Sequence, residues 1–350
     1  MNDVTQPDQE PRATRRWPRV VAIVLGTLVL LVLVIPLVWP VPPLRGVQDP
    51  YALRDADSKF VTVDGMRFHY KEAGSREASC TVLLLHGFGA SVFSWEKVLP
   101  ELGSDCRVVA FDRPAFGLTS RPLPGDWNGT ANNPYTLEAS AKQTVKLMDA
   151  LGIDRATLVG HSAGGAVAAV VAARYPDRVH ALVLEDPAIL ERGGTPGWLA
   201  PVLRTPQFAR IGPLLVRRIA GPAGDSLLER AFYDSARLTP EVISGYRRPL
   251  RAENWDKALW AFSTAPQTLD PADVLGEIRQ PTLVIAGRND RIVDYESIVK
   301  TARMIPGARL ETYPETGHIP HEERPDTFVR DVERFLDSVE STAPASMPSN

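Results

Sequence analysis

A serine between two glycines, at the junction of an apolar strand and a small-residue helix, is the first feature of this sequence that could do chemistry. Residues 160–164 read Gly-His-Ser-Ala-Gly, and they follow the apolar run Ala156–Val159 and precede a predicted helix over Gly165–Tyr175. Glycines lack a β-carbon, so strand and helix can approach closely around a turn that strains the serine. This context predicts a nucleophile elbow with Ser162 as nucleophile. The alternative is an ordinary small-residue turn of an α/β protein.

A serine hydroxyl becomes a good nucleophile only when a base takes its proton and a third group orients that base. Among six histidines, His318 follows the predicted strand Arg309–Tyr313 in a loop at the carboxyl edge of the sheet. It also comes last in the order serine, acid, histidine that this architecture requires. His318 is therefore the predicted base, and His321, three residues later, is the alternative that we expect to be structural.

The predicted acid is Asp290, which follows the strand Thr282–Ala286 after a Gly-Arg-Asn turn. Asp186 also ends a strand, Ala181–Glu185, and is the alternative acid because a carboxylate there could also reach the base. Asp294 is more typical of a helix N-cap.

An oxyanion formed by attack on a carbonyl needs two backbone N–H donors. The amide of Ala163 begins the helix after the nucleophile, and the amide of Phe88 follows the predicted strand Thr81–His86. All of these groups lie at one edge of the sheet, where active sites of open α/β sheets form. Phe88 and Ala163 are the predicted oxyanion donors.

Alternating strands and helices predict a mostly parallel sheet of eight strands, covered on both faces. The segments Lys59–Val63 and Met66–Lys71 flank Asp64-Gly65, which predicts an antiparallel hairpin. Thr136 is expected to cap a helix that extends to Leu151. Between Ala188 and Asp270 the alternation stops and short helical stretches appear, which indicates a helical cap inserted over the active edge.

The N-terminal part contains a long apolar segment, Val20 to Trp39, without a charged residue. A helix of this length spans roughly 30 Å, the thickness of a hydrocarbon core. Four arginines precede it, whereas Arg45 is the one basic residue in the dozen that follow, so the N-terminus is predicted to be cytoplasmic and the bulk of the chain extracytoplasmic. A cleaved signal peptide would need small residues at a cleavage site, which the proline-rich end lacks. We therefore predict an uncleaved transmembrane helix.

The charge of the chain narrows the possible binding partners. The formal charge is −3 and no basic block suggests nucleic acid, and no protein partner is evident.

The two cysteines, Cys80 and Cys106, each precede a predicted strand by one residue. If those strands are parallel neighbours, their starts lie about 5 Å apart, within disulfide range. The alternative is two unrelated buried thiols.

These motifs resemble those of the α/β-hydrolase superfamily, in its cap-bearing branch. The resemblance covers roughly residues 58–336. It rests on five segments: His86–Gly89, Asp112–Gly117, Gly160–Gly165, Gly287–Asp290 and Gly317–Glu322. It implies that the strands beginning at Thr81 and Arg107 are neighbours, which supports the Cys80–Cys106 bridge. One departure is Ala115, where relatives usually have glycine.

The resemblance implies a serine hydrolase that requires no metal or cofactor. We expect it to cleave a carboxylic ester, for example a lipid-like one such as a monoacylglycerol, with membrane lipid as a further partner. The alternatives are a C–C bond hydrolase of ring-cleavage products with the same triad, and a non-catalytic binding module. The predicted divisions are a cytoplasmic segment 1–19, a transmembrane helix 20–39, a Pro-rich spacer 40–57, core parts 58–187 and 271–338, a cap 188–270 and a disordered tail 339–350.

A basic amphipathic stretch lies within the predicted cap. Arg210, Arg217 and Arg218 alternate there with apolar residues. A cap helix with a solvated face is one interpretation, and contact with anionic lipid is the other.

Overall fold

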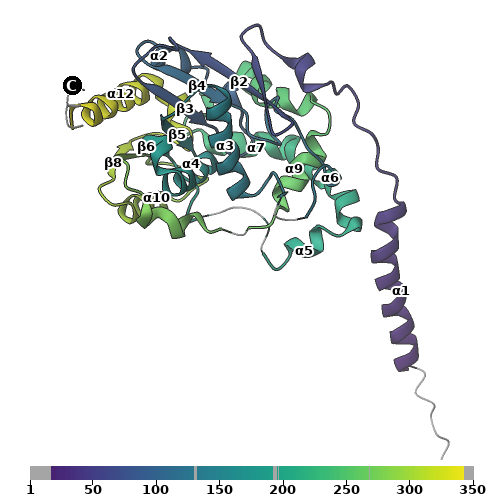
Figure 1. Cartoon of the computed structure of the whole chain (residues 1–350). Coiled ribbons are helices and arrows are strands. Elements are labelled where there is room, and N and C mark those ends of the chain that lie inside the picture. The colour runs from purple at the N-terminus through teal and green to yellow at the C-terminus, as the bar shows by residue number, and fades with distance from the viewer. Residues whose placement is uncertain (1–16, 130–131, 192–194, 196, 268, 343–350) are drawn as a thin grey trace, which may run out of the picture.

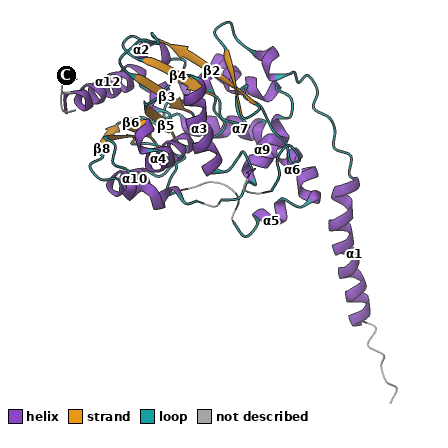
Figure 2. Ribbon diagram, in the orientation of Figure 1, coloured by secondary structure: helices purple, strands orange, loops and turns teal. Residues whose placement is uncertain are grey.

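The structure is a computed structural model that describes residues 17–129, 132–191, 195, 197–267 and 269–342. Its centre is one eight-stranded sheet in the order β1-β2-β4-β3-β5-β6-β7-β8, flanked by helices (Figure 2). The strands are β1 Lys59–Val63, β2 Met66–Ala73, β3 Thr81–Leu85, β4 Arg107–Phe111, β5 Ala156–His161, β6 Val179–Glu185, β7 Thr282–Gly287 and β8 Arg309–Tyr313. Strands β3 to β8 run parallel, and β2 pairs antiparallel with both β1 and β4. The predicted sheet is confirmed.

The first two strands form the predicted hairpin. Asp64 and Gly65 both have positive φ angles, 50° and 77°, as a two-residue turn between twisted strands requires. Glycine adopts this region without a steric penalty, and aspartate tolerates it better than most residues.

Buried apolar residues form a separate core on each face of the sheet. One core packs α3 Leu137–Ala150, α4 Ala163–Arg174 and α10 Tyr295–Met304 against the strands. The other packs α2 Leu99–Leu102 and α12 Pro325–Thr342 against the opposite face. Central strands such as β5 are therefore buried on both sides, which explains their continuous apolar sequences.

Between β6 and β7 the described chain contains helices and no strand, as expected for the predicted cap 188–270. These helices are α5 Ala200–Leu203, α6 Pro206–Ala220, α7 Pro222–Ala231, α8 Pro240–Arg247 and α9 Trp255–Ser263. Of these, α5, α6 and α9 lie on the side of the body nearest the N-terminal helix (Figure 1).

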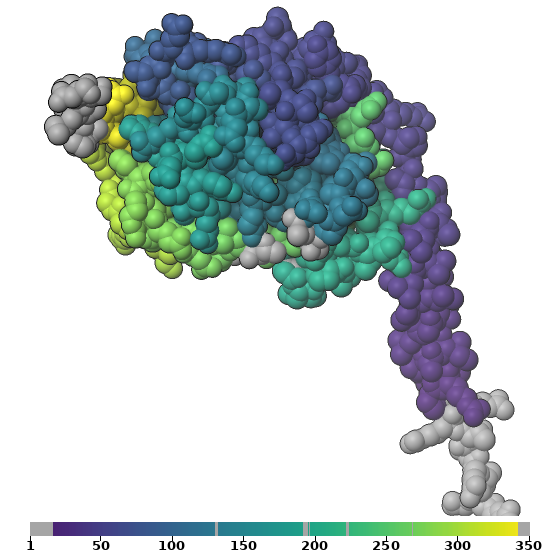
Figure 3. Space-filling view, in the orientation of Figure 1, coloured from purple at the N-terminus to yellow at the C-terminus, as the bar shows by residue number. Residues whose placement is uncertain are grey.

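The N-terminal helix α1, Trp17–Val38, is long and apolar enough to cross a membrane, and none of its described residues is buried. It extends away from the rest of the molecule (Figure 3). Its predicted start at Val20 falls three residues after the observed one, and most of the predicted cytoplasmic segment lies outside the described residues.

Two of the cap arginines contact the segment that follows α1. Arg210 donates to the Trp39 carbonyl at 3.4 Å, and Arg217 donates to the Pro42 carbonyl at 2.5 Å. Arg217 also pairs with the fully buried Asp256 at 2.8 Å. These two side chains therefore hold the spacer against the cap.

Two element boundaries were predicted wrongly. The sequence predicts one helix over Phe93–Leu102, but this segment forms a 3-10 turn over Val92–Trp95 followed by the short α2. Ser91 caps the 3-10 turn, and Pro100 favours a new helix start. The tail predicted to begin at 339 is helical to Thr342 because Val339 packs into the core, while 343–350 lie outside the described residues.

Candidate active site

Ser162 lies at a sharp junction between β5 and α4, and its backbone is strained. Its φ and ψ are 53° and −119°, a region that non-glycine residues rarely adopt. The turn is held because the Ser162 amide donates to the Glu185 carbonyl at 2.9 Å and the Gly165 amide donates back to Ser162 at 2.9 Å. A β-carbon on Gly164 would stand 2.2 Å from the Leu85 carbonyl oxygen, so the glycines of the motif are sterically required.

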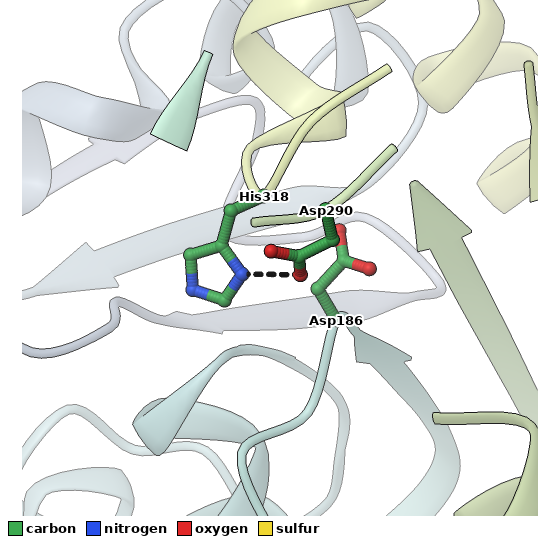
Figure 4. Close-up of side chains that lie close together, drawn as sticks. All are labelled: Asp186, Asp290 and His318. Carbon is green, nitrogen blue, oxygen red and sulfur yellow. Dashed lines mark hydrogen bonds and ion pairs between the residues drawn. The ribbon is translucent and has the colours of Figure 1, made fainter. Parts of the chain in front are cut away.

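His318 and Asp290 form a hydrogen-bonded pair at the same edge of the sheet. The Nδ1 of His318 lies 2.7 Å from Oδ2 of Asp290 (Figure 4). The other oxygen of Asp290 accepts from the amides of Ile292 at 2.6 Å and Val293 at 3.0 Å, which orients the carboxylate. With the proton on Nδ1 directed at Asp290, Nε2 is left as the proton acceptor that a serine nucleophile needs.

The loop that carries His318 is joined directly to the elbow. Nε2 of His161, the residue before the nucleophile, donates to the His318 carbonyl at 2.7 Å. The two rings are 4.8 Å apart between centroids, and both Ser162 and His318 are buried. Burial, and after it the neighbouring imidazoles of His318 and His321, hold the pKa of His161 well below its usual range, so it is a neutral donor.

Of the predicted oxyanion donors, Ala163 directly follows Ser162, and Phe88 follows Gly87 in the loop after β3. A β-carbon on Gly87 would lie 3.1 Å from the Ser162 β-carbon, so the loop after β3 is in contact with the nucleophile. Within the described residues, the amides of Phe88 and Ala163 have no hydrogen-bond acceptor. His86 supports this loop: its Nδ1 donates to Gly87 at 2.8 Å and its Nε2 accepts from the Arg113 amide at 3.0 Å. Burial, helped by the Arg113 charge, lowers the pKa of His86 to about 4.

His321 and Asp186, the two alternatives, occupy different positions. His321 is fully buried, with Nδ1 2.8 Å from Glu185 and its ring stacked 4.2 Å from Trp95. It is remote from solvent and already paired, as a structural residue would be. Asp186 is also buried, but it lies beside Asp290 and His318, and one donor atom from each of the three residues falls within 4.8 Å of the others. Such a cluster could hold a small cation, although Asp290 and His318 are directed at one another.

A second serine–histidine–aspartate set was missed by sequence reasoning. Nε2 of His69 lies 2.8 Å from the Ser58 hydroxyl, and Nδ1 lies 2.6 Å from Asp112. The Ser58 oxygen also accepts from the Asp55 amide at 2.9 Å. Ser58 precedes β1 in a loop, without a strand–helix elbow. These residues are 54 positions apart at most, and no motif connects them, so only the pairing of β2 with both β1 and β4 reveals the set.

Aromatic side chains connect the oxyanion loop to the cap. Phe116 packs edge-on against Phe88 at 5.7 Å and against Phe262 of α9 at 4.9 Å. Phe88 also contacts Phe262 at 5.9 Å and stays half exposed. Beside the nucleophile the surface is therefore apolar and aromatic, and the cap contributes to it.

The strained serine, the oriented histidine and the free amides at one edge of a parallel sheet define the class of an α/β serine hydrolase. The match to the family model described as the alpha/beta hydrolase fold covers residues 81–325, and the chain belongs to that family.

Three relatives bear on its activity. A 2-hydroxy-6-oxo-6-phenylhexa-2,4-dienoate hydrolase of Burkholderia cepacia is 31% identical, over 80% of this chain and 96% of that protein. A membrane phospholipase A of known structure is 25% identical over 93% of this chain and 99% of its own, with a TM-score of 0.63. An esterase of Thermogutta terrifontis is 28% identical over 81% and 99%, with a TM-score of 0.63. The chain is thus similar to hydrolases of more than one kind of bond.

Proposed function

We propose that Ser162, His318 and Asp290 form a catalytic triad that cleaves an apolar acyl substrate. Ser162 attacks the carbonyl carbon and His318 takes its proton. The amides of Phe88 and Ala163 stabilise the oxyanion. His318 then gives the proton to the leaving group, and water hydrolyses the acyl-enzyme by the same base. The observation that carries this proposal is the 2.7 Å bond between His318 and Asp290 in a loop bonded to the residue before Ser162.

The first candidate substrate is a ketone in which the enzyme cleaves the adjacent carbon–carbon bond. Several curated relatives near 30% identity are named as hydrolases of 2-hydroxy-6-oxo-dienoates and related compounds, which favours this alternative over the ester that we expected. In such a reaction the tetrahedral adduct breaks its C–C bond, and the electron pair passes into the conjugated system of the leaving fragment. That fragment takes the proton from His318, and the acyl group stays on Ser162.

The second candidate is a carboxylic ester of a lipid, supported by one specific observation. The similarity to the membrane phospholipase A extends over 93% of the chain, beyond the hydrolase body. The helix α1 would place such an enzyme beside its substrate. In this reaction the leaving group is an alkoxide, which takes the same proton from His318.

Turnover assays on the full chain in detergent separate the two candidates. A vinylogous diketone that loses its absorbance on C–C cleavage is compared with p-nitrophenyl esters of graded length and a monoacylglycerol. Diketone kcat/KM far above that of every ester supports the first candidate, and the reverse order supports the second. Ser162→Ala is the control. If the wild-type protein reacts neither with these substrates nor with a fluorophosphonate probe, the proposed triad is wrong.

For localisation, we propose that α1 stays attached as a single-pass anchor with the hydrolase outside the cytoplasm. The contacts from Arg210 and Arg217 to the segment directly after α1 support a defined position of the cap near the membrane surface. Intact mass and alkaline extraction of the native protein test this. A mature N-terminus beyond Val38, with release into the soluble fraction, would identify α1 as a signal sequence instead.

A further inference from the structure

We propose that Asp186 is a second orienting acid for His318, a positioning residue that holds the imidazole when Asp290 cannot. The inference rests on the proposed triad and adds a residue to it. Asp186 follows β6 and Asp290 follows β7, and these two strands are parallel neighbours, with Glu185 opposite Ile285. The two carboxyl groups therefore lie next to each other on one side of the same imidazole (Figure 4).

The backbone holds Asp186 firmly in this position. Its amide donates to the Ile285 carbonyl at 2.9 Å, and its Oδ1 accepts from the Gly287 amide at 2.9 Å. Asp186 also has a positive φ of 39°, which a non-glycine residue adopts only under constraint from its surroundings.

Its second oxygen is available for His318. Oδ2 of Asp186 is buried and has no hydrogen-bond partner within the described residues. One carboxylate oxygen of Asp186, one of Asp290 and one ring nitrogen of His318 lie within 4.8 Å of one another. A buried polar atom without a partner is unfavourable, so a hydrogen bond from a donor such as the imidazole N–H would stabilise this oxygen.

Charge decides which of the two acids acts. Burial, then the charges of Asp290 and Glu185 and, more weakly, Glu323, raise the pKa of Asp186 well above its ordinary value. The Nδ1 of His318 is already directed at Asp290. Two adjacent buried carboxyls do not both ionise easily, so ionisation of Asp186 is suppressed while Asp290 holds His318. Removing Asp290 removes that repulsion and leaves Asp186 free to ionise and accept from His318.

The test compares rates of Ser162 labelling by a fluorophosphonate, which needs no knowledge of the natural substrate. Asp290→Ala opens space for the imidazole to reach Asp186, and Asp290→Ala with Asp186→Asn removes both carboxylates. Asn at 186 retains an oxygen for the Gly287 amide. Loss of a triad aspartate costs about 10⁴-fold when no other acid replaces it. We expect the single variant to lose about 10²-fold and the double variant about 10²-fold more.

A pH profile separates positioning from a structural role. A carboxylate beside an imidazole raises the imidazole pKa, so the acid limb of the labelling rate should lie at higher pH in Asp290→Ala than in the double variant. Asp290→Ala with Asp294→Asn is the matched control, because Asp294 is an exposed N-cap residue of α10 without a side-chain cap bond. It should label like Asp290→Ala alone.

The outcomes are distinguishable. If the wild type labels but the single and double variants lose equal rate and share one acid limb, Asp186 has no orienting role. If the wild type does not label, the proposed triad fails first. If circular dichroism shows that Asp290→Ala does not fold, Asp290→Asn replaces it, because Asn keeps an acceptor for the Ile292 and Val293 amides. It is compared with the double variant that carries both Asp290→Asn and Asp186→Asn. The same loss in both Asn variants overturns the proposal.

Discussion

Gly87 is in contact with Ser162: a β-carbon added at Gly87 would stand 3.1 Å from the Ser162 β-carbon and 2.9 Å from Nδ1 of His161. Gly87→Ala should therefore displace the loop that carries the Phe88 amide. Loss of one oxyanion donor costs about 10²–10³-fold in kcat, so we expect a loss of this order with the best substrate. Gly276→Ala is the matched control, because nothing lies within 4 Å of its added β-carbon. Equal activity of the two variants would argue against Phe88 as a donor.

The two serine–histidine–aspartate sets should differ in reactivity. Ser58 is hydrogen-bonded to His69, as a nucleophile would be to its base. However, only Ser162 has the elbow conformation and a free backbone amide directly after it. A fluorophosphonate should label the wild type once, on Ser162. Ser162→Ala should abolish labelling and Ser58→Ala should leave it intact, as peptide mass mapping will record. Modification of Ser58 would show that an elbow is unnecessary here.

Ala115 occupies a conformation that suits glycine. Its φ is 78°, and left-handed backbone costs a residue with a β-carbon about 1–2 kcal/mol. Ala115→Gly should therefore raise the free energy of unfolding by up to about 1 kcal/mol, after the extra chain entropy of glycine is subtracted. Thermal denaturation measures it. Ala169→Gly, in the buried interior of α4, should instead be destabilised by about 1 kcal/mol or more, and the same sign at both sites would refute the strain argument.

Cys80 and Cys106 are linked by a disulfide, with α-carbons 4.9 Å apart and 26 positions between them in sequence. Thr81 pairs with Arg107 in the parallel β3–β4 register, so the bridge closes the start of two neighbouring strands. Chain-entropy arguments assign a loop of this length about 3 kcal/mol. Cys80→Ser with Cys106→Ser should lower the midpoint of urea unfolding accordingly. Protein that shows two free thiols by mass spectrometry under non-reducing conditions would contradict the bridge.

The Asp112 carboxylate joins three segments that are far apart in the sequence. It accepts from the Val92 amide at 2.7 Å, the Leu118 amide at 2.7 Å and the His69 ring. Burial opposes ionisation of Asp112, but the His69 imidazole and these donors outweigh it and hold the pKa at about 2.

The folded-state pKa of Asp112 lies below its unfolded value. The ionised carboxylate therefore contributes its full stabilisation of the fold above about pH 4, and this contribution is lost as the pH falls toward 2. A shift of this size corresponds to about 2–3 kcal/mol. Asp112→Asn should remove it, so the difference in unfolding free energy from wild type should shrink between pH 4 and pH 2. A pH-independent difference would show that packing, rather than charge, is what the substitution removes.

Local sequence was sufficient wherever one segment carries its own geometry. The elbow at 160–164, the Asp64-Gly65 turn and the cap at Thr136, whose hydroxyl accepts from the Ala139 amide at 3.1 Å, follow from backbone restrictions of a few adjacent residues. The edge of the sheet at which Asp290 and His318 appear follows equally from the alternation of strands and helices and from chain order. The 3-10 turn at Val92–Trp95 and the end of α12 could not be predicted locally, because contacts with residues distant in sequence determine them.

Two features arose only in the tertiary structure, for one physical reason: they depend on contacts between strands that are not adjacent in sequence. The β1–β2 and β2–β4 pairings together assembled Ser58, His69 and Asp112, and the β6–β7 pairing placed Asp186 beside Asp290. The sequence by itself determined Ser162 as the candidate nucleophile and His318 and Asp290 as its candidate partners. That a third group, Asp186, also lies close to His318 was decided by the pairing of two strands that are about a hundred residues apart, and no local motif contains that distance.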